Sequence, residues 1–157
     1  MQFLIKAFRH FFVFVVLLAS ASFASAASLL PFDYSWTVGD VKKIIAAGAD
    51  INARGEYGET PLMAAVARAP TSENLEMIQA LIDAGADVNA RTEDGSTPLM
   101  GAGKFNENPE VIQALIDAGA DINARSAEGS TPLMAAVLLN KNPEVTQALI
   151  DAGADVN

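Results

Sequence analysis

An internal repeat constrains the fold of this chain more than any other feature. The residues TPLM occur three times, and the copies begin at Thr60, Thr97 and Thr131. Each copy is followed by the nine-residue sequence QALIDAGAD, which ends at Asp87, Asp121 and Asp155. Successive TPLM copies are 37 and then 34 residues apart. A period in this range is typical of a solenoid, in which helical hairpins bury their apolar faces against one another.

The second unit shows what each copy is expected to form. Thr97 and Pro98 predict a helix start, because a threonine side chain accepts a backbone N–H of the first turn and proline suits the first helical position. Asn108 and Pro109 repeat this signal, and apolar residues then recur at helical spacing, at Val111, Ile112, Leu115 and Ile116. Gly119 stands where a helix commonly ends in a left-handed residue. Each unit is therefore predicted to be a helix, a turn, a second helix and a projecting loop.

The repeated unit resembles the ankyrin repeat family. The matching segments are GSTPL at 95–99, GAD at 119–121 and DINA at 121–124, with equivalents in the other units. The resemblance covers about residues 38–157 and implies an all-α, ankyrin-like solenoid of stacked helix-turn-helix units with projecting hairpin loops. We expect a repeat domain over residues 27–157, divided into a half unit at about 38–54 and full units at about 55–91, 92–125 and 126–157.

The chain departs from the family pattern directly after TPL, where the family usually has histidine and this chain has Met63, Met100 and Met134. The change removes a polar tie between threonine and histidine and substitutes apolar packing between neighbouring units. Thioether sulfur also suits Cu(I), but stacked helices lie about 10 Å apart, so three sulfurs spaced in this way cannot readily close on one ion. We therefore expect core packing and no metal site.

The second unit also differs from its neighbours in its first helix. Gly101 and Gly103 stand where the first unit has Ala64 and Val66 and the third has Ala135 and Val137. Each glycine costs about 1 kcal/mol relative to alanine inside a helix. Either this helix is less stable than the other helices of the stack, or another segment approaches its backbone closely.

The first 26 residues have the order of a secretory signal peptide. Lys6 and Arg9 precede a compact apolar run at 11–18. A small-residue cleavage pattern spans Ala24–Ala27, and we expect cleavage after Ala26. The repeat domain is therefore expected to leave the cytoplasm.

An uncleaved membrane anchor is the alternative, because residues 11–32 carry no charge. Several serines make the second half of this segment a poor membrane span, so we expect no membrane insertion of the mature chain. The sequence has no cysteine and no Asn-x-Ser/Thr acceptor, which gives no sign of a disulfide-bonded or glycosylated eukaryotic protein. A bacterial periplasmic or secreted protein is the most economical interpretation.

The charge balance bears on the class of partner. Removal of residues 1–26 takes away Lys6 and Arg9 and no acidic residue, so the net charge of −9 becomes −11. This balance argues against nucleic acid, where basic side chains must neutralise phosphates, and against anionic lipid surfaces. It is compatible with a basic protein partner. We favour the simpler interpretation that much of the charge was copied with the repeated tail, which carries two aspartates in every unit.

Most residue types used in catalysis are missing from the repeat domain. The only histidine is His10, in the expected signal peptide, and there is no cysteine. Their absence removes most zinc sites, the Cys and His nucleophiles and the commonest general base. No GxSxG sequence occurs either. We expect no enzyme activity, no cofactor and no metal.

Two ladders of charged residues follow the repeat. Each unit contributes one aspartate to the first ladder, at Asp50, Asp87, Asp121 and Asp155. The second ladder holds Arg54, Arg91 and Arg125. We expect loop hydrogen bonds and ion pairs that hold adjacent hairpins in register, because the repeat spacing explains every member without a ligand.

The resemblance implies protein–protein interaction, in which the partner usually meets the loop tips and the exposed side of each first helix. Carried onto this sequence, the candidate residues are Glu56, Tyr57, Arg68, Glu93, Asp94, Lys104, Phe105, Glu128, Leu138 and Leu139. These positions differ between units while the tails barely change. Aromatic residues concentrate binding energy, so Tyr57 and Phe105 are expected anchors together with the two leucines. The alternative for Phe105 and the leucines is that they fill gaps between helices.

Two further functions stay open. A structural envelope protein would self-associate through its C-terminal edge, because the last helix keeps apolar residues and only Thr146 is polar where Ile78 and Ile112 stand. An inhibitor or immunity-type binder would instead hold a secreted toxin or enzyme. At the other end of the solenoid, aromatic residues are expected to cover the first edge, namely Phe32, Tyr34 and Trp36.

Overall fold

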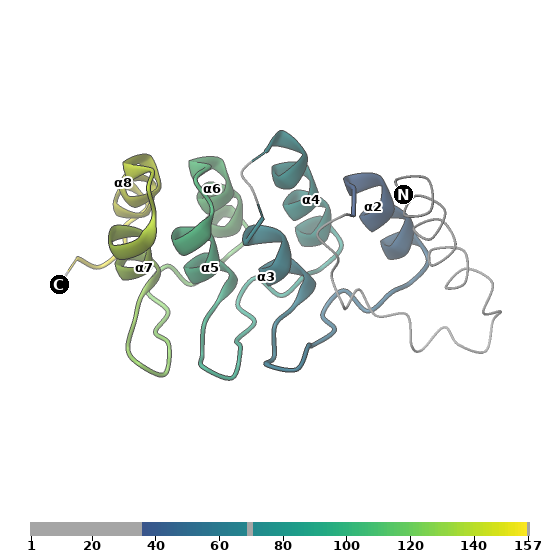
Figure 1. Ribbon diagram of the computed structural model, residues 1–157, viewed down its shortest axis with the longest axis horizontal. Coiled ribbons are helices and arrows are strands. Elements are labelled where there is room, and N and C mark those ends of the chain that lie inside the picture. Colours follow the sequence, from purple (N-terminus) through teal and green to yellow (C-terminus); the bar gives the residue numbers. More distant parts are fainter. Residues whose placement is uncertain (1–35, 69–70, 157) are drawn as a thin grey trace, which may run out of the picture.

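The computed structural model describes residues 36–68 and 71–156 (Figure 1). Its helices, in chain order, are α2 (Val38–Ala46), α3 (Pro61–Val66), α4 (Ser72–Asp83), α5 (Pro98–Phe105), α6 (Pro109–Asp117), α7 (Pro132–Leu139) and α8 (Pro143–Asp151). The predicted all-α repeat solenoid is confirmed. The expected signal peptide and the aromatic residues Phe32 and Tyr34 lie outside the described residues.

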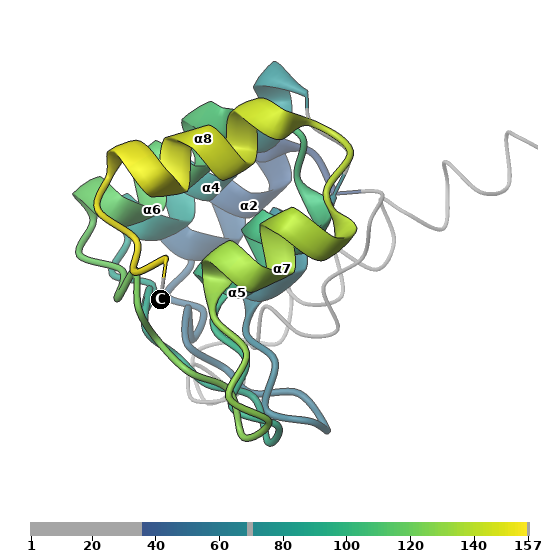
Figure 2. The same ribbon diagram turned by 90° about the vertical axis from the view of Figure 1, so that its left-hand side faces the viewer.

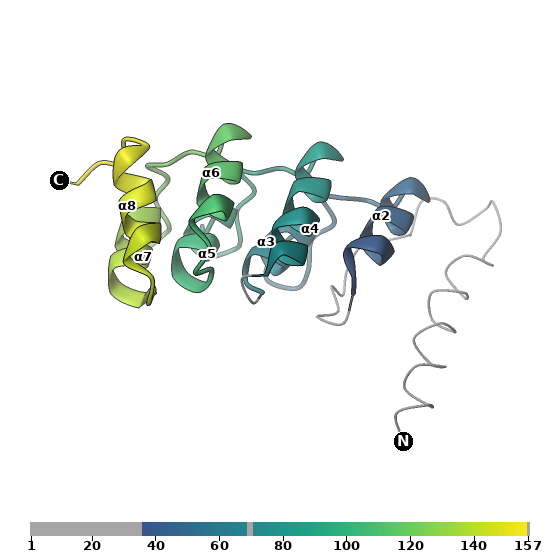
Figure 3. The same ribbon diagram turned by 90° about the horizontal axis from the view of Figure 1, so that it is seen from above.

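The helices lie in two rows. One row holds α3, α5 and α7, each in contact with the next, and the other holds α2, α4, α6 and α8. Figure 2 shows the rows end-on, with the hairpin loops projecting from the side of α5 and α7, and Figure 3 shows the helix pairs following one another along the long axis. We call the pairs α3–α4, α5–α6 and α7–α8 units one, two and three. α2 lies beside α4, in the row of second helices.

The first helices begin with the predicted threonine caps. In each unit the threonine side-chain oxygen accepts the N–H of the methionine three residues on, at 3.2–3.4 Å, in the pairs Thr60–Met63, Thr97–Met100 and Thr131–Met134. Asn108 and Asn142 cap the second helices of units two and three, each accepting a backbone N–H at 3.0 Å. These bonds satisfy N–H groups that have no partner inside the helix.

The core lies between the two rows. The TPLM leucines Leu62, Leu99 and Leu133 are at most 8% exposed, and the leucines of the repeated tail are fully buried, at Leu81, Leu115 and Leu149. Full burial of one leucine stabilises the fold by about 1.5–3 kcal/mol relative to exposure. Because the same positions are buried in every unit, the core is continuous along the stack.

The methionines differ from one another in burial. Met100 is 5% exposed, as predicted for core packing, whereas the prediction is wrong for Met134, which is 45% exposed. Met63 is half-buried. The difference follows from position in the stack, since unit two has a neighbour on each side and no described unit follows unit three.

The two glycines of α5 have different surroundings. A Cβ on Gly103 would lie 2.9 Å from the carbonyl oxygen of Pro132, so the backbone of α7 approaches α5 closely at this point. A Cβ on Gly101 would meet only the Cγ2 atom of Val66, at 3.3 Å. Close approach therefore explains Gly103, whereas Gly101 has nearly enough room for a methyl group.

The helices are short compared with a bilayer. Within residues 36–68 and 71–156, no helix is long and apolar enough to cross a membrane.

Candidate recognition surface

Each projecting loop is a closed hairpin. A backbone bond of 2.9–3.0 Å joins its two sides, from Gly55 to Glu59, from Thr92 to Ser96 and from Ser126 to Ser130. Just before its second side, each hairpin turns through a glycine with φ of +77° to +82°, at Gly58, Gly95 and Gly129. This conformation is costly for other residues, so the hairpin shape is built into the backbone.

Neighbouring hairpins are also joined to each other. The N–H of Glu93 donates to the carbonyl of Tyr57, and the N–H of Ala127 donates to the carbonyl of Asp94, both at 2.9 Å. The loops are packed closely enough that a Cβ on Gly95 would lie 3.0 Å from the Ala127 nitrogen. The three loops therefore form one row with a fixed spacing (Figure 1).

A ladder of asparagines ties the units together where the hairpins start. The side chain of Asn89 donates to the carbonyl of Gly119 at 2.9 Å, and its oxygen accepts the N–H of Asp121 at 2.8 Å. Asn52 makes the same pair of bonds to Gly85 and Asp87. This role was not predicted, although the repeated Asp-x-Asn sequence places an asparagine at the same point of every unit.

The arginine ladder acts between units, but not through the expected ion pairs. The Nη1 atom of Arg54 donates to the carbonyl of Arg91 at 2.6 Å, and that of Arg91 donates to the carbonyl of Arg125 at 2.8 Å. The aspartates instead make local turns, in which Asp50 and Asp87 each accept the N–H two residues on at 2.9 Å. Hydrogen bonds from the arginines to backbone carbonyls therefore hold neighbouring hairpins in register, because the hairpin turn directs these carbonyls toward the arginines.

A second asparagine ladder lies in the turns between first and second helices. Asn106 is fully buried and its amide donates to the carbonyl of Val66 at 3.1 Å and to the side-chain oxygen of Asn74 at 3.2 Å. Asn140 donates to the carbonyls of Gly103 and Asn106, at 2.8 and 2.9 Å. These bonds fix the far end of each first helix to the unit before it. No sequence motif pointed to them.

The predicted tip residues lie at the ends of the hairpins. Glu56, Tyr57, Glu93 and Glu128 are exposed, and Tyr57 has 65% of its surface accessible. The row of carboxylates and one aromatic ring is therefore presented to solvent on loops that the backbone bonds hold in place.

Asp94 has a structural role at the tip of the second hairpin. Its carboxylate accepts hydrogen bonds from the hydroxyl of Thr92, from the N–H of Ser96 at 3.1 Å and from the hydroxyl of Ser96 at 3.1 Å. The bond from Thr92, followed by the bonds from Ser96, lowers the pKa of the Asp94 carboxyl below its ordinary value. The side chain is exposed, but most of its hydrogen-bonding capacity serves the loop.

The ends of α5 and α7 carry the apolar part of the predicted surface. Phe105 is 53% exposed, and the ammonium of Lys104 lies 4.8 Å from its ring centre. Leu138 and Leu139 are 77% and 54% exposed. These side chains therefore leave much of their area free, and gap filling between helices does not account for them.

Arg68 is the candidate that the structure separates from the rest. It is half-buried, and its Nη1 atom lies 3.9 Å from the sulfur of Met77 on α4. The guanidinium is thus directed back onto its own unit. We define the recognition surface by the exposed candidates other than Asp94, whose carboxylate is bonded within its own hairpin, namely Glu56, Tyr57, Glu93, Lys104, Phe105, Glu128, Leu138 and Leu139.

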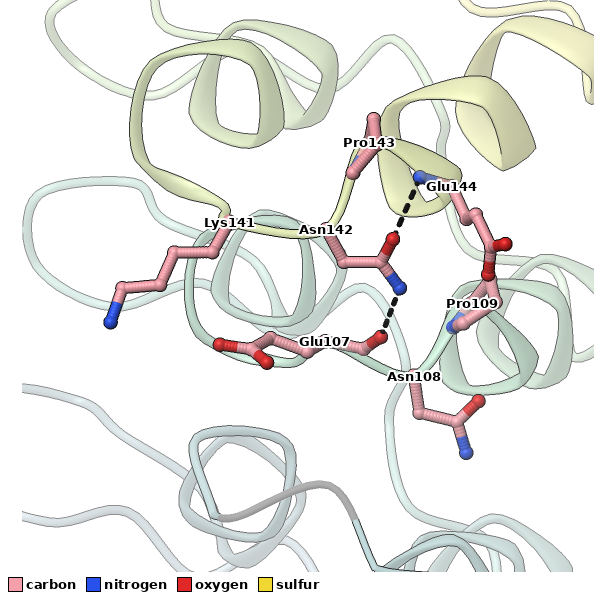
Figure 4. A pocket seen from close by; sticks show the side chains of 7 residues that line it. All are labelled: Glu107, Asn108, Pro109, Lys141, Asn142, Pro143 and Glu144. Carbon is pink, nitrogen blue, oxygen red and sulfur yellow. Dashed lines mark hydrogen bonds between the residues drawn. The ribbon is translucent and has the colours of Figure 1, made fainter.

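A shallow hollow of about 530 Å³ lies between the interhelix turns of units two and three (Figure 4). At its centre the Asn142 amide donates to the carbonyl of Glu107 at 2.7 Å, and its oxygen accepts the N–H of Glu144 at 3.0 Å. The polar groups in the middle of the hollow are therefore engaged in capping α8 and joining the units. The hollow brings together no nucleophile and base.

The part of the chain that the structure describes contains no candidate metal site. No group of three or more histidine, cysteine, aspartate or glutamate side chains there is close enough to hold an ion.

Comparison with known proteins agrees with this architecture. A family model described as ankyrin repeats (3 copies) matches residues 37–126 and 69–157. No curated protein matches the chain.

Proposed function

The chain belongs to the ankyrin repeat family, and we propose that it is a non-catalytic protein-binding module that uses the recognition surface. Ankyrin repeats generally mediate protein–protein interaction, and proteins built from them are typically binding scaffolds without catalytic activity. We propose that the partner contacts the loop tips and the first-helix ends of this chain.

The observation that carries this assignment is the exposure of large apolar side chains at equivalent places. Phe105 and Leu139 occupy the same position in units two and three, and both are more than half exposed. Tyr57 adds a second aromatic side chain at a hairpin tip. Such side chains cost free energy in water, and buried aromatic anchors supply most of the energy in many interfaces.

The framework that carries these side chains favours binding for a second reason. Backbone bonds from Glu93 to Tyr57 and from Ala127 to Asp94 fix the loops before a partner arrives. A surface that is already ordered loses little conformational entropy on association, so more of the contact energy appears as affinity. The proposed mechanism is rigid display of a preformed surface.

We place this binding outside the cytoplasm, in the periplasm or in the medium of a bacterium. The support is the order of basic residues, apolar run and small-residue cleavage pattern in residues 1–26. N-terminal sequencing of the protein recovered from the producing cells checks this part of the proposal. The expected first residue is Ala27, and an exported form that begins at Met1 contradicts the cleavage.

Affinity capture from envelope extract, with mass spectrometry of the retained proteins, tests the binding function. The bait is compared with a variant carrying Tyr57→Ala, Phe105→Ala and Leu139→Ala. A matched control carries Lys42→Ala, Gln79→Ala and Gln113→Ala, which are exposed positions on the row of second helices. We expect a protein that the parent and the control retain and the first variant loses. Equal retention by all three baits contradicts the assigned surface.

A further inference from the structure

The apolar part of the recognition surface is open even where one unit follows another. Phe105 of unit two is exposed although unit three follows it, and Leu139 stands at the same position one unit later. Leu138 corresponds to Lys104, which is also exposed. Stacking of the units therefore does not cover these positions, and their burial requires another molecule.

The hairpin tips, which project from the side of α5 and α7, carry the acidic part of the same surface (Figure 2). Each tip holds one exposed glutamate, at Glu56, Glu93 and Glu128. Within residues 36–68 and 71–156, the side chains of these three glutamates form no ion pair and accept no hydrogen bond. Their carboxylates are therefore available to a partner.

The arginines at the bases of the hairpins do not neutralise these glutamates. Arg54 and Arg91 donate to backbone carbonyls of their own hairpin and of the next one. The three hairpins, at 54–59, 91–96 and 125–130, hold five carboxylates and three arginines, which leaves a net charge of −2. The tips are therefore an acidic border beside the apolar side chains.

Copying of the repeat explains the charge of the tails but not that of the tips. Aspartates of the tail have local hydrogen bonds, such as those that Asp83 and Asp117 accept from a glutamine one turn earlier, at 2.8 and 2.7 Å. The two tip residues, in contrast, differ in every copy and read Glu-Tyr at 56–57, Glu-Asp at 93–94 and Ala-Glu at 127–128. In the third hairpin the glutamate has changed position and is still present.

We propose that the partner of the recognition surface presents a basic polypeptide segment. Its lysine or arginine side chains pair with Glu56, Glu93 and Glu128, and its apolar side chains cover Phe105, Leu138 and Leu139. Complementary charge of this kind directs a partner to its site and fixes its register. The inference rests on the proposed function, because it assigns a chemical class to the partner of the same surface.

The combination of carboxylates and apolar side chains selects a polypeptide. A metal ion needs several ligands close together, and the described residues contain no group of three or more acidic, histidine or cysteine side chains that could hold one. A polyamine supplies positive charge but no large apolar group to cover Phe105 and the two leucines. A segment with both basic and apolar side chains matches both parts of the surface.

Lys104 sets the direction in which this segment lies. Helix α5 begins just after the second hairpin and ends at Phe105, about 12 Å farther along at 1.5 Å per residue. The ammonium of Lys104 lies 4.8 Å from the Phe105 ring centre at this far end. Because like charges repel, the basic residues of the partner are directed to the tips and its apolar residues to the helix ends.

Selection of peptides from a displayed random library on the purified protein, followed by biolayer interferometry of the synthesised peptides, tests the proposal. We expect the retained peptides to contain more lysine and arginine than the library, and to bind less tightly as salt is added. A variant carrying Glu56→Gln, Glu93→Gln and Glu128→Gln is expected to raise their Kd about tenfold, mainly through slower association.

The matched control carries Glu76→Gln, Glu110→Gln and Glu144→Gln. These substitutions also remove one exposed glutamate from each unit, but on the second helices α4, α6 and α8. The control is expected to bind the peptides like the parent, which separates pairing at the tips from a change in net charge. Thermal melting of each variant shows whether it is folded.

The variant with alanine at Tyr57, Phe105 and Leu139 distinguishes failure of this inference from failure of the proposed function. Uncharged or acidic peptides that this variant no longer binds would support the recognition surface and overturn its basic partner. Peptides that the alanine variant binds as tightly as the parent would contradict the surface itself and overturn both. Equal binding by the parent and the glutamine variant, equal weakening in the glutamine variant and its control, or a library that yields no binding peptide also overturns the inference.

Discussion

The side-chain amide of Asn106 lies 3.2 Å from the side-chain oxygen of Asn74, and this hydrogen bond joins two buried asparagines of neighbouring units. The same amide donates to the carbonyl of Val66 at 3.1 Å, while the Asn74 amide donates to the carbonyl of Ala65 at 2.8 Å. Polar groups buried in this way are favourable only when they are fully bonded. The pair therefore specifies one register between units one and two.

Asn106→Ala is expected to destabilise the protein by about 2–3 kcal/mol, because it leaves the Asn74 oxygen and the Val66 carbonyl buried without this donor. Urea unfolding of the parent and the variant measures the difference. Gln113→Ala, at an exposed position of α6, serves as the control and is expected to change stability by less than about 0.5 kcal/mol. Equal effects of the two substitutions would contradict the role of the asparagine pair.

Gly103→Ala and Gly101→Ala are expected to have opposite effects. An added methyl at Gly103 meets the Pro132 carbonyl and forces α7 away, so the melting temperature should fall. At Gly101 the methyl meets only a side-chain carbon of Val66, and a small shift leaves most of the gain in helix propensity, up to about 1 kcal/mol. Differential scanning calorimetry checks both. A stabilising Gly103→Ala would show that α5 and α7 are not in close contact.

Thr97→Ala is expected to cost about 1 kcal/mol, because the N–H of Met100 loses its acceptor at the start of α5. Thr97→Ser retains the hydroxyl and is expected to recover most of the loss. Chemical denaturation of the three proteins measures this. The cap has no role if the serine and alanine variants are equally stable.

The hairpin at residues 92–96 is expected to loosen in acid. The pKa of Asp94 is lowered in the folded protein by bonds from Thr92 and Ser96, so the ionised carboxylate stabilises the loop above the ordinary aspartate pKa of about 3.9. That contribution is lost as the pH falls through the lower, folded-state pKa. An NMR titration of the Asp94 carboxyl follows the change. Thr92→Val should raise the midpoint, and an unchanged midpoint would show that the hydroxyl does not hold the carboxylate.

The fold was predictable because its signals are local and repeated. A threonine followed by proline predicts a helix start from adjacent residues alone, and Thr60, Thr97 and Thr131 all act as predicted. Three copies of one pattern then imply stacking, since no single hairpin buries its own apolar face.

Contacts between units were less predictable. The role of Asn89 depends on the distance to the next unit, and nothing in the sequence shows which carbonyl its amide will meet. The arginines make the loop hydrogen bonds that were expected, but with backbone carbonyls in place of the expected ion pairs, because the direction of these carbonyls is set by the hairpin turn. Burial of Met134 was predicted from its copies, but burial at an edge depends on whether a neighbouring unit covers it.

The candidate surface was predictable only in part. Divergence between internal copies located the exposed positions, including Phe105 and Leu139. It did not distinguish Asp94, which closes its own loop, or Arg68, whose guanidinium lies near Met77. A side chain's local hydrogen bonds decide whether it is free to meet a partner, and the copies do not reveal them.

The central claim is that the protein binds a partner through Tyr57, Phe105 and Leu139, and titration calorimetry with the purified captured partner tests it most directly. Tyr57→Ala and Phe105→Ala are each expected to weaken binding at least about tenfold, which corresponds to about 1.4 kcal/mol. Gln113→Ala, on the row of second helices, should leave the Kd unchanged. Loss of binding with Gln113→Ala and unchanged binding with the two aromatic variants would place the partner on the opposite face and contradict the account.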